Sequence, residues 1–114
     1  MNTRKTIISH FFNNVKNSLG YYDWKLNFVI GSSEGHCWHK TKTIDIGLTC
    51  KDLELLVLHE ISHIDTCRFC NNKHNITFWY RYEDLIRRFN KHSPMPRRYN
   101  LEGGHYKFTR NQTV

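Results

Sequence analysis

The stretch LLVLHEISHI, residues 55–64, decides the fold of this chain. It is apolar on nearly all sides of a helix, and a helix of that kind is buried. Its two histidines, His59 and His63, are four residues apart, so their side-chain roots lie on one helical face, about 5–6 Å apart. Both imidazoles can therefore reach one metal ion, with Glu60 beside that ion and outside the ligand pair.

The H-E-x-x-H pattern gains weight from its surroundings. Roughly two per cent of chains with this content of His and Glu would hold the pattern by accident. Burying two histidines and a glutamate is costly unless a partner satisfies them, and a dication would do so. The alternative is a buried helix whose histidines bond to neighbouring carbonyl oxygens. We predict one catalytic zinc ion on His59 and His63, with Glu60 as the general base for a zinc-activated water.

Composition limits the class of protein. A length of 114 residues predicts one domain, and 39% hydrophobic with 14% aromatic content argues for a folded globule. No apolar run approaches the roughly 20 residues of a membrane span, and no signal-peptide core follows Met1. We therefore expect a cytoplasmic protein without membrane association, whose 4 cysteines stay reduced.

The formal net charge of +7 is unevenly distributed. By count from the sequence, residues 1–57 hold 7 basic and 5 acidic side chains, and residues 58–114 hold 10 and 5. The basic half could present a stripe made of Arg81, Arg87, Arg88, Lys91, Arg97, Arg98, Lys107 and Arg110. Such a stripe is typical of nucleic-acid binding, and it is equally typical of a solvated face that keeps a small protein soluble.

Hydrophobic spacing outlines six elements. Helical spacing spans residues 4–18, 50–66 and 76–90, and strand-like patterns cover 24–30, 36–40 and 43–47. Thr49 and Asp52 form a capping box for the second helix, and the last two strands are expected to pair as a hairpin. The pattern predicts an α+β domain with an N-terminal helix, a small three-stranded, mostly antiparallel sheet, the motif helix and a following C-terminal helix. We assign residues 1–92 to this domain and residues 93–114 to a basic, irregular tail.

The third zinc ligand must come from beyond the motif, because a catalytic zinc site uses three protein ligands and keeps a fourth position for water. The candidates are His74, Glu83 and His105. His74 lies just ahead of the third helix, and Glu83 has a spacing similar to that of the gluzincin metalloproteases. Nine residues of helix rise about 13 Å, so His74 and Glu83 cannot both reach one ion. If Glu83 is not a ligand, it is expected to pair with Arg87.

The string His74-Asn75-Ile76-Thr77-Phe78-Trp79 carries a family resemblance. H-E-x-x-H followed by H-x-x-x-F-W resembles the SprT-like and WLM-like zincin metalloproteases and their YgjP-type relatives. Residues 42–48, KTIDIGL, are similar to the family's strand along the active-site cleft. The resemblance covers about residues 42–89. It implies a minimal zincin-like fold, His74 as the third ligand, and hydrolysis of peptide bonds, including those of DNA-associated proteins.

The chain departs from the family in its spacer, which holds Cys67-x-x-Cys70. This pair could be half of a structural zinc site completed by Cys37, Cys50, His36 or His39, a redox pair, or two reduced thiols. Two other functions stay open beside a peptidase that acts on a protein or peptide substrate. One is a zinc-containing nucleic-acid-binding module without catalysis, and the other is a zinc hydrolase of a non-peptide substrate such as a nucleotide.

Overall fold

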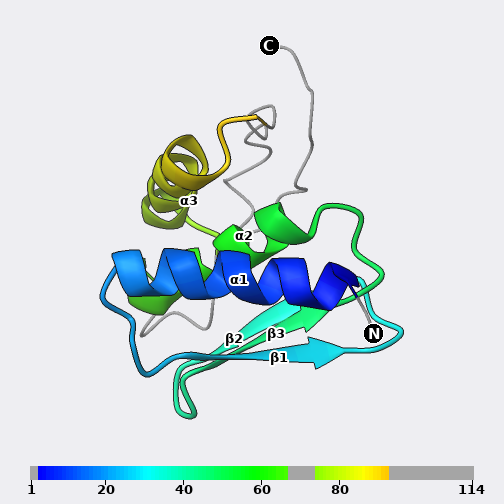
Figure 1. Ribbon diagram of the computed structural model, residues 1–114. Helices are drawn as coiled ribbons and strands as arrows, with labels where there is room; N and C mark the ends of the chain where they lie inside the picture. Colours follow the sequence, from blue (N-terminus) through cyan, green and yellow to red (C-terminus); the bar gives the residue numbers. More distant parts are fainter. Residues whose placement is uncertain (1–2, 67–73, 93–114) are drawn as a thin grey trace. The chain divides into compact units, whose positions relative to one another are not determined.

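The structure, a computed structural model, describes residues 3–66 and 74–92. The chain divides into two compact units, Met1–Ile61 and Ser62–Val114. The elements run in the order α1 (Thr3–Ser18), β1 (Lys25–Val29), β2 (Gly35–Trp38), β3 (Thr43–Gly47), α2 (Leu53–Thr66) and α3 (Ile76–Phe89) (Figure 1). All six predicted elements are present, and the α+β class is confirmed.

The sheet of the first unit is mixed. Its strand order is β1-β3-β2, with β1 parallel to β3 and β2 antiparallel to β3. The hairpin of β2 and β3 is therefore confirmed, whereas the mostly antiparallel character that we predicted is not, because one of the two pairings is parallel. The most buried strand takes the centre: Ile44 and Ile46 of β3 are fully buried, as expected of a strand with neighbours on both sides.

The two faces of the sheet differ in polarity. Cys37, Ile44 and Ile46 lie on the buried face. The opposite face carries Asp45, whose carboxylate accepts hydrogen bonds from Trp38 Nε1 at 2.8 Å and from Asn27 Nδ2 at 3.0 Å. Since these donors come from β2 and β1, one side chain of the central strand joins all three strands.

Within the first unit, helix α1 packs through a single apolar stripe. Ile8, Phe12 and Val15 are buried at spacings of four and three residues, and the helix contacts β1 (Figure 1). At its start, Arg4 donates from Nη1 to the carbonyl oxygen of Leu48 at 2.8 Å and from Nη2 to that of Cys50 at 2.6 Å. These bonds hold the loop that leads into α2.

Helix α2 begins three residues later than predicted, at Leu53. The Asp52 carboxylate accepts from the backbone N–H of Leu55 at 3.2 Å, which is the bond of an N-cap residue. Thr49 does not have this role, because its backbone N–H donates to the carbonyl oxygen of Ser32 at 2.9 Å in the preceding loop. The predicted capping box was therefore wrong, and Asp52 alone caps the helix.

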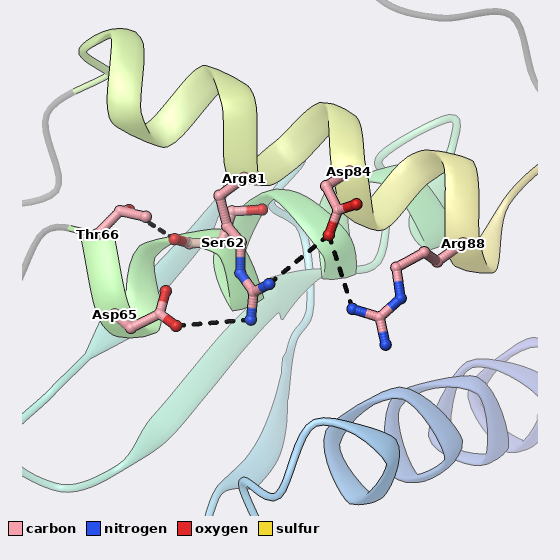
Figure 2. Close-up of polar contacts among 6 residues, drawn as sticks. All are labelled: Ser62, Asp65, Thr66, Arg81, Asp84 and Arg88. Carbon is pink, nitrogen blue, oxygen red and sulfur yellow. Dashed lines mark hydrogen bonds and ion pairs between the residues drawn. The ribbon is translucent and has the colours of Figure 1, made fainter.

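Helix α3 is strongly amphipathic and belongs to the second unit. Asn75 caps it by accepting from the Phe78 backbone N–H at 2.9 Å. Its buried face consists of Phe78, Trp79, Tyr82, Leu85 and Ile86. Figure 2 shows the polar contacts at its side: Arg81 reaches Asp65 of α2 at 3.5 Å and Asp84 at 3.7 Å, and Asp84 also pairs with Arg88 at 3.6 Å.

Among the described residues, no helix combines the length and the apolar character that a membrane span requires. The predicted tail, residues 93–114, and the residues Cys67, Cys70 and His105 lie outside the described part of the chain.

Candidate metal centre

Two histidines come from adjacent turns of α2. His63 is buried, with 2% of its surface exposed, and the His59 side chain is 17% exposed. The apolar residues around them in the helix, such as Leu58 and Ile61, are fully buried and fix this part of α2 in the core. The helix therefore holds both imidazoles at defined positions with little freedom to turn into solvent.

A third imidazole joins them from the residue just before α3. His74 Nε2 lies 3.2 Å from His63 Nε2. One potential ligand atom from each of His59, His63 and His74 lies within 4.8 Å of the others. Two nitrogen ligands of a tetrahedral zinc ion lie about 3.3 Å apart when each Zn–N bond is about 2.0–2.1 Å long. The spacing of these rings therefore fits a metal ion, and three closely placed histidines could hold one.

Aromatic packing positions two of the three rings. The Phe78 ring stacks on His63, with centroids 4.4 Å apart and an interplanar angle of 23°, and lies 4.7 Å from the His74 centroid. Phe78 is itself fully buried and lies in the first turn of α3, four residues after His74. The packing of Phe78 against two imidazoles was not predicted, although the sequence shows the four-residue spacing between His74 and Phe78.

Burial also favours the neutral form of the third histidine. Desolvation lowers the pKa of His74 from its ordinary value, because a charged imidazolium loses hydration there. The neutral ring that this favours is the form that donates a lone pair to a metal ion.

Glu60 is a buried acid beside this cluster. Only 4% of its surface is exposed, and its Oε2 lies 3.9 Å from His59 Nε2. Burial, and secondly the negative charge of Asp45, raise the pKa of Glu60 to about 8. A carboxyl group with a pKa in this range can both take and release a proton near neutral pH. A cation held by the histidines would favour its ionised form.

The other candidate ligands lie apart from the cluster. Glu83 pairs with Arg87 at 3.6 Å, as expected of a residue that is not a ligand. Within residues 3–66 and 74–92, no group of three or more potential ligands includes it. Cys37 is buried on the sheet, and Cys50, a half-buried free thiol, donates to the carbonyl oxygen of Asp52 at 3.6 Å.

The histidines of the first unit contact aromatic rings. The His36 ring lies 3.9 Å from the Trp38 ring, and His39 makes an edge contact with Trp24 at 5.9 Å. Neither belongs to a potential metal group among the described residues.

Comparisons with protein-family models, with curated proteins and with solved structures found no match. The resemblance to the SprT-like and WLM-like metalloproteases therefore rests on the motif residues alone, and membership of that family stays a prediction.

Proposed function

We propose that this protein is a zinc-dependent metallopeptidase in which His59, His63 and His74 hold the metal and Glu60 is the general base. The observation that carries the proposal is the meeting of three imidazoles within 4.8 Å beside a buried carboxyl group. A structural zinc site usually has four protein ligands, whereas a catalytic site has three and leaves a position open. Among residues 3–66 and 74–92, the potential ligands are three histidines, a number that fits a site of the second kind.

Zinc is proposed because of the donor set. Imidazole nitrogen also suits copper, nickel and iron, but tetrahedral coordination by three neutral histidines is a common arrangement of catalytic zinc. When bound, zinc would supply Lewis acidity, which polarises the scissile carbonyl group and makes water more acidic.

The residues of the chain supply the proton transfers. Glu60 would take a proton from the attacking water and pass it to the leaving amine, since its Oε2 is near the histidine cluster and its buried place keeps it from solvent. His59, His63 and His74 would stay neutral throughout, because each gives its lone pair to the metal.

Action on DNA-associated proteins is a separate part of the proposal. The described arginines of the basic stripe have acidic partners: Arg81 pairs with Asp65 and Asp84, Arg87 with Glu83, and Arg88 with Asp84. These pairs reduce the positive charge that α3 can offer to phosphates, so α3 adds little support for a nucleic-acid surface.

The experiment that tests the proposal compares metal content with peptide cleavage. Purified protein should contain stoichiometric zinc by elemental mass spectrometry and should cleave a fluorogenic peptide library, and a chelator should stop the cleavage until zinc is restored. Glu60→Gln should keep the zinc and lose about 10²–10⁴-fold in kcat, the usual worth of a general base. Glu54→Gln, in the first turn of the same helix, is the matched control and should keep full activity.

The outcomes separate the competing functions. A protein with zinc, no hydrolytic activity on peptides and steeply salt-dependent DNA binding would be a binding module. Chelator-sensitive cleavage of nucleotides but not of peptides would make it a non-peptide hydrolase. Wild-type rates in Glu60→Gln would refute the general-base role.

A further inference from the structure

We propose that Gly35 is a positioning residue for Glu60: its missing side chain leaves the space in which the Glu60 carboxyl group lies. The inference rests on the proposed function, because it concerns the placement of the general base. Gly35 is the first residue of β2 and belongs to the same compact unit as Glu60.

The space at Gly35 is already filled. A Cβ atom built there would lie 2.8 Å from Glu60 Cγ, 2.8 Å from Glu60 Oε2 and 3.0 Å from the carbonyl oxygen of Asp45. Carbon atoms in van der Waals contact lie about 3.5–4.0 Å apart, so an added methyl group would overlap the Glu60 side chain along its length. The register explains the direction: Gly35 pairs with Ile46 and alternates with Cys37, two residues of the buried face.

Backbone geometry does not explain this glycine. Gly20 and Gly31 have φ angles of +82° and +79°, a region that favours glycine, and a Cβ at either position would meet nothing within 4 Å. Gly35 has no such angle, so the constraint there is space alone.

A side chain added at Gly35 would force the Glu60 side chain, rather than the sheet backbone, to move. On one side of the added atom is the Asp45 carbonyl, which belongs to the central strand and cannot shift without disturbing the sheet. On the other side is the Glu60 side chain. Because Glu60 is 4% exposed, it cannot swing into solvent to relieve the overlap. Gly35→Ala therefore displaces the carboxyl group, whereas the packing of His63 and His74 against Phe78 does not involve Gly35.

The kinetic consequence is specific. A displacement of about 1 Å at a catalytic group can cost on the order of 10²-fold in rate. In the zinc-loaded protein, Gly35→Ala should lower kcat by about tenfold or more, with KM changed by less than about twofold and zinc still stoichiometric. Ser33→Ala, an exposed change two residues earlier, is the matched control and should leave all three quantities unchanged. A kcat within about twofold of wild type would overturn the proposal.

A double-mutant cycle tests the contact without any activity. Urea unfolding in the presence of chelator should show that Gly35→Ala raises the unfolding equilibrium constant by about tenfold in the wild-type background, as overpacking does. In the Glu60→Ala background the same change should cost about threefold or less, since the overlapped side chain is gone. In the Glu54→Ala background the full cost should persist.

Each outcome of the cycle decides the proposal. An equal cost in the Glu60→Ala and wild-type backgrounds, or loss of folding in both, would place the crowding at the Asp45 carbonyl and overturn it. Folding of the Gly35→Ala, Glu60→Ala double variant when Gly35→Ala alone fails to fold would support it. If the wild-type protein cleaves no peptide, the proposed function fails, and the cycle still decides whether Gly35 sets the place of the Glu60 carboxyl group.

Discussion

The pKa of Glu60 is determined by its burial and by the charge of Asp45. Its pKa of about 8, against an ordinary 4.5, means that the metal-free fold accommodates the neutral acid better than the carboxylate. Desolvation is the larger cause because burial removes the water that would stabilise the charge, and Asp45 adds repulsion. The same burial that places this carboxyl group beside His59 therefore destabilises its charged form until a cation is present.

The first prediction at this scale concerns stability and pH in the metal-free protein. Because the folded-state pKa of Glu60 lies above the unfolded value, its contribution to the free energy of unfolding is fully present below about pH 4.5 and is lost as pH rises through about 8. Glu60→Gln cannot ionise, so it should be more stable than wild type by on the order of a few kcal/mol at pH 8, with a smaller difference at pH 5. Urea unfolding with chelator at both values measures this. Glu54→Gln should show no such pH-dependent gain. The prediction would be contradicted if the stability difference between Glu60→Gln and wild type were the same at pH 5 and pH 8.

The second prediction isolates the charge of Asp45. Asp45→Asn removes the repulsion but not the burial, so the pKa of Glu60 should fall and should still lie above 4.5. Carbon NMR of the labelled Glu60 carboxyl in the metal-free protein follows the titration directly. An unchanged midpoint would show that the charge of Asp45 does not act on Glu60.

At the scale of the element, α3 supports the candidate metal centre from outside the ligand set. The Asn75 cap starts the helix one residue after His74, and Phe78 in its first turn packs against His63 and His74. The position of the third imidazole therefore depends on where α3 begins. The amphipathic pattern of the sequence predicted the start of this helix correctly, at Ile76, whereas the Asn75 cap was not predicted.

Phe78 offers a test of that support. Phe78→Leu keeps an apolar side chain but removes the flat ring that packs against both imidazoles, so zinc affinity should fall by about three- to tenfold, in line with the worth of one aromatic pair. Competition with a chelating dye measures the affinity. Phe89→Leu, in the last turn of the same helix, is the matched control, and equal affinities of the two variants would contradict the prediction.

At the scale of the whole molecule, the candidate ligands come from separate positions along the chain. His59 and His63 share one helix, whereas His74 follows residues 67–73, a segment that lies outside the described structure. An ion that binds all three in the folded state and not in the unfolded chain must stabilise the fold by mass action.

Zinc binding should therefore raise the melting temperature. At a free zinc concentration about 1,000 times the Kd, the gain is about 4 kcal/mol, which for a chain of this size corresponds to a rise on the order of 10 °C or more. Scanning calorimetry with zinc and with chelator measures the shift. His74→Ala should lose most of the rise, and His10→Ala, an exposed change in α1, should keep it. The same rise in His74→Ala as in wild type would exclude His74 as a ligand.

Local sequence determined most of the elements. The bounds of α1, the three strands and α3 agree with the hydrophobic spacing to within a few residues, because burial periodicity is a local property of helices and strands. It also determined that His59 and His63 share a face, since a helix places residues four apart side by side. The start of α2 was missed because Thr49 and Asp52 both have cap chemistry, and only the loop contact of Thr49 decides between them.

Tertiary structure decided what depends on residues distant in sequence. Three features have no signature in a local pattern: the parallel pairing of β1 with β3, the repulsion of Glu60 by Asp45 and the crowding at Gly35. Residue spacing left His74 and Glu83 both open, and the fold brings His74 to His63. Each arises because packing brings together residues that are far apart in the sequence, whereas hydrophobic periodicity reports only on neighbouring residues. The sequence thus names the candidate metal-binding and proton-transfer groups, while the fold brings His74 to His63 and determines how strongly Glu60 holds its proton.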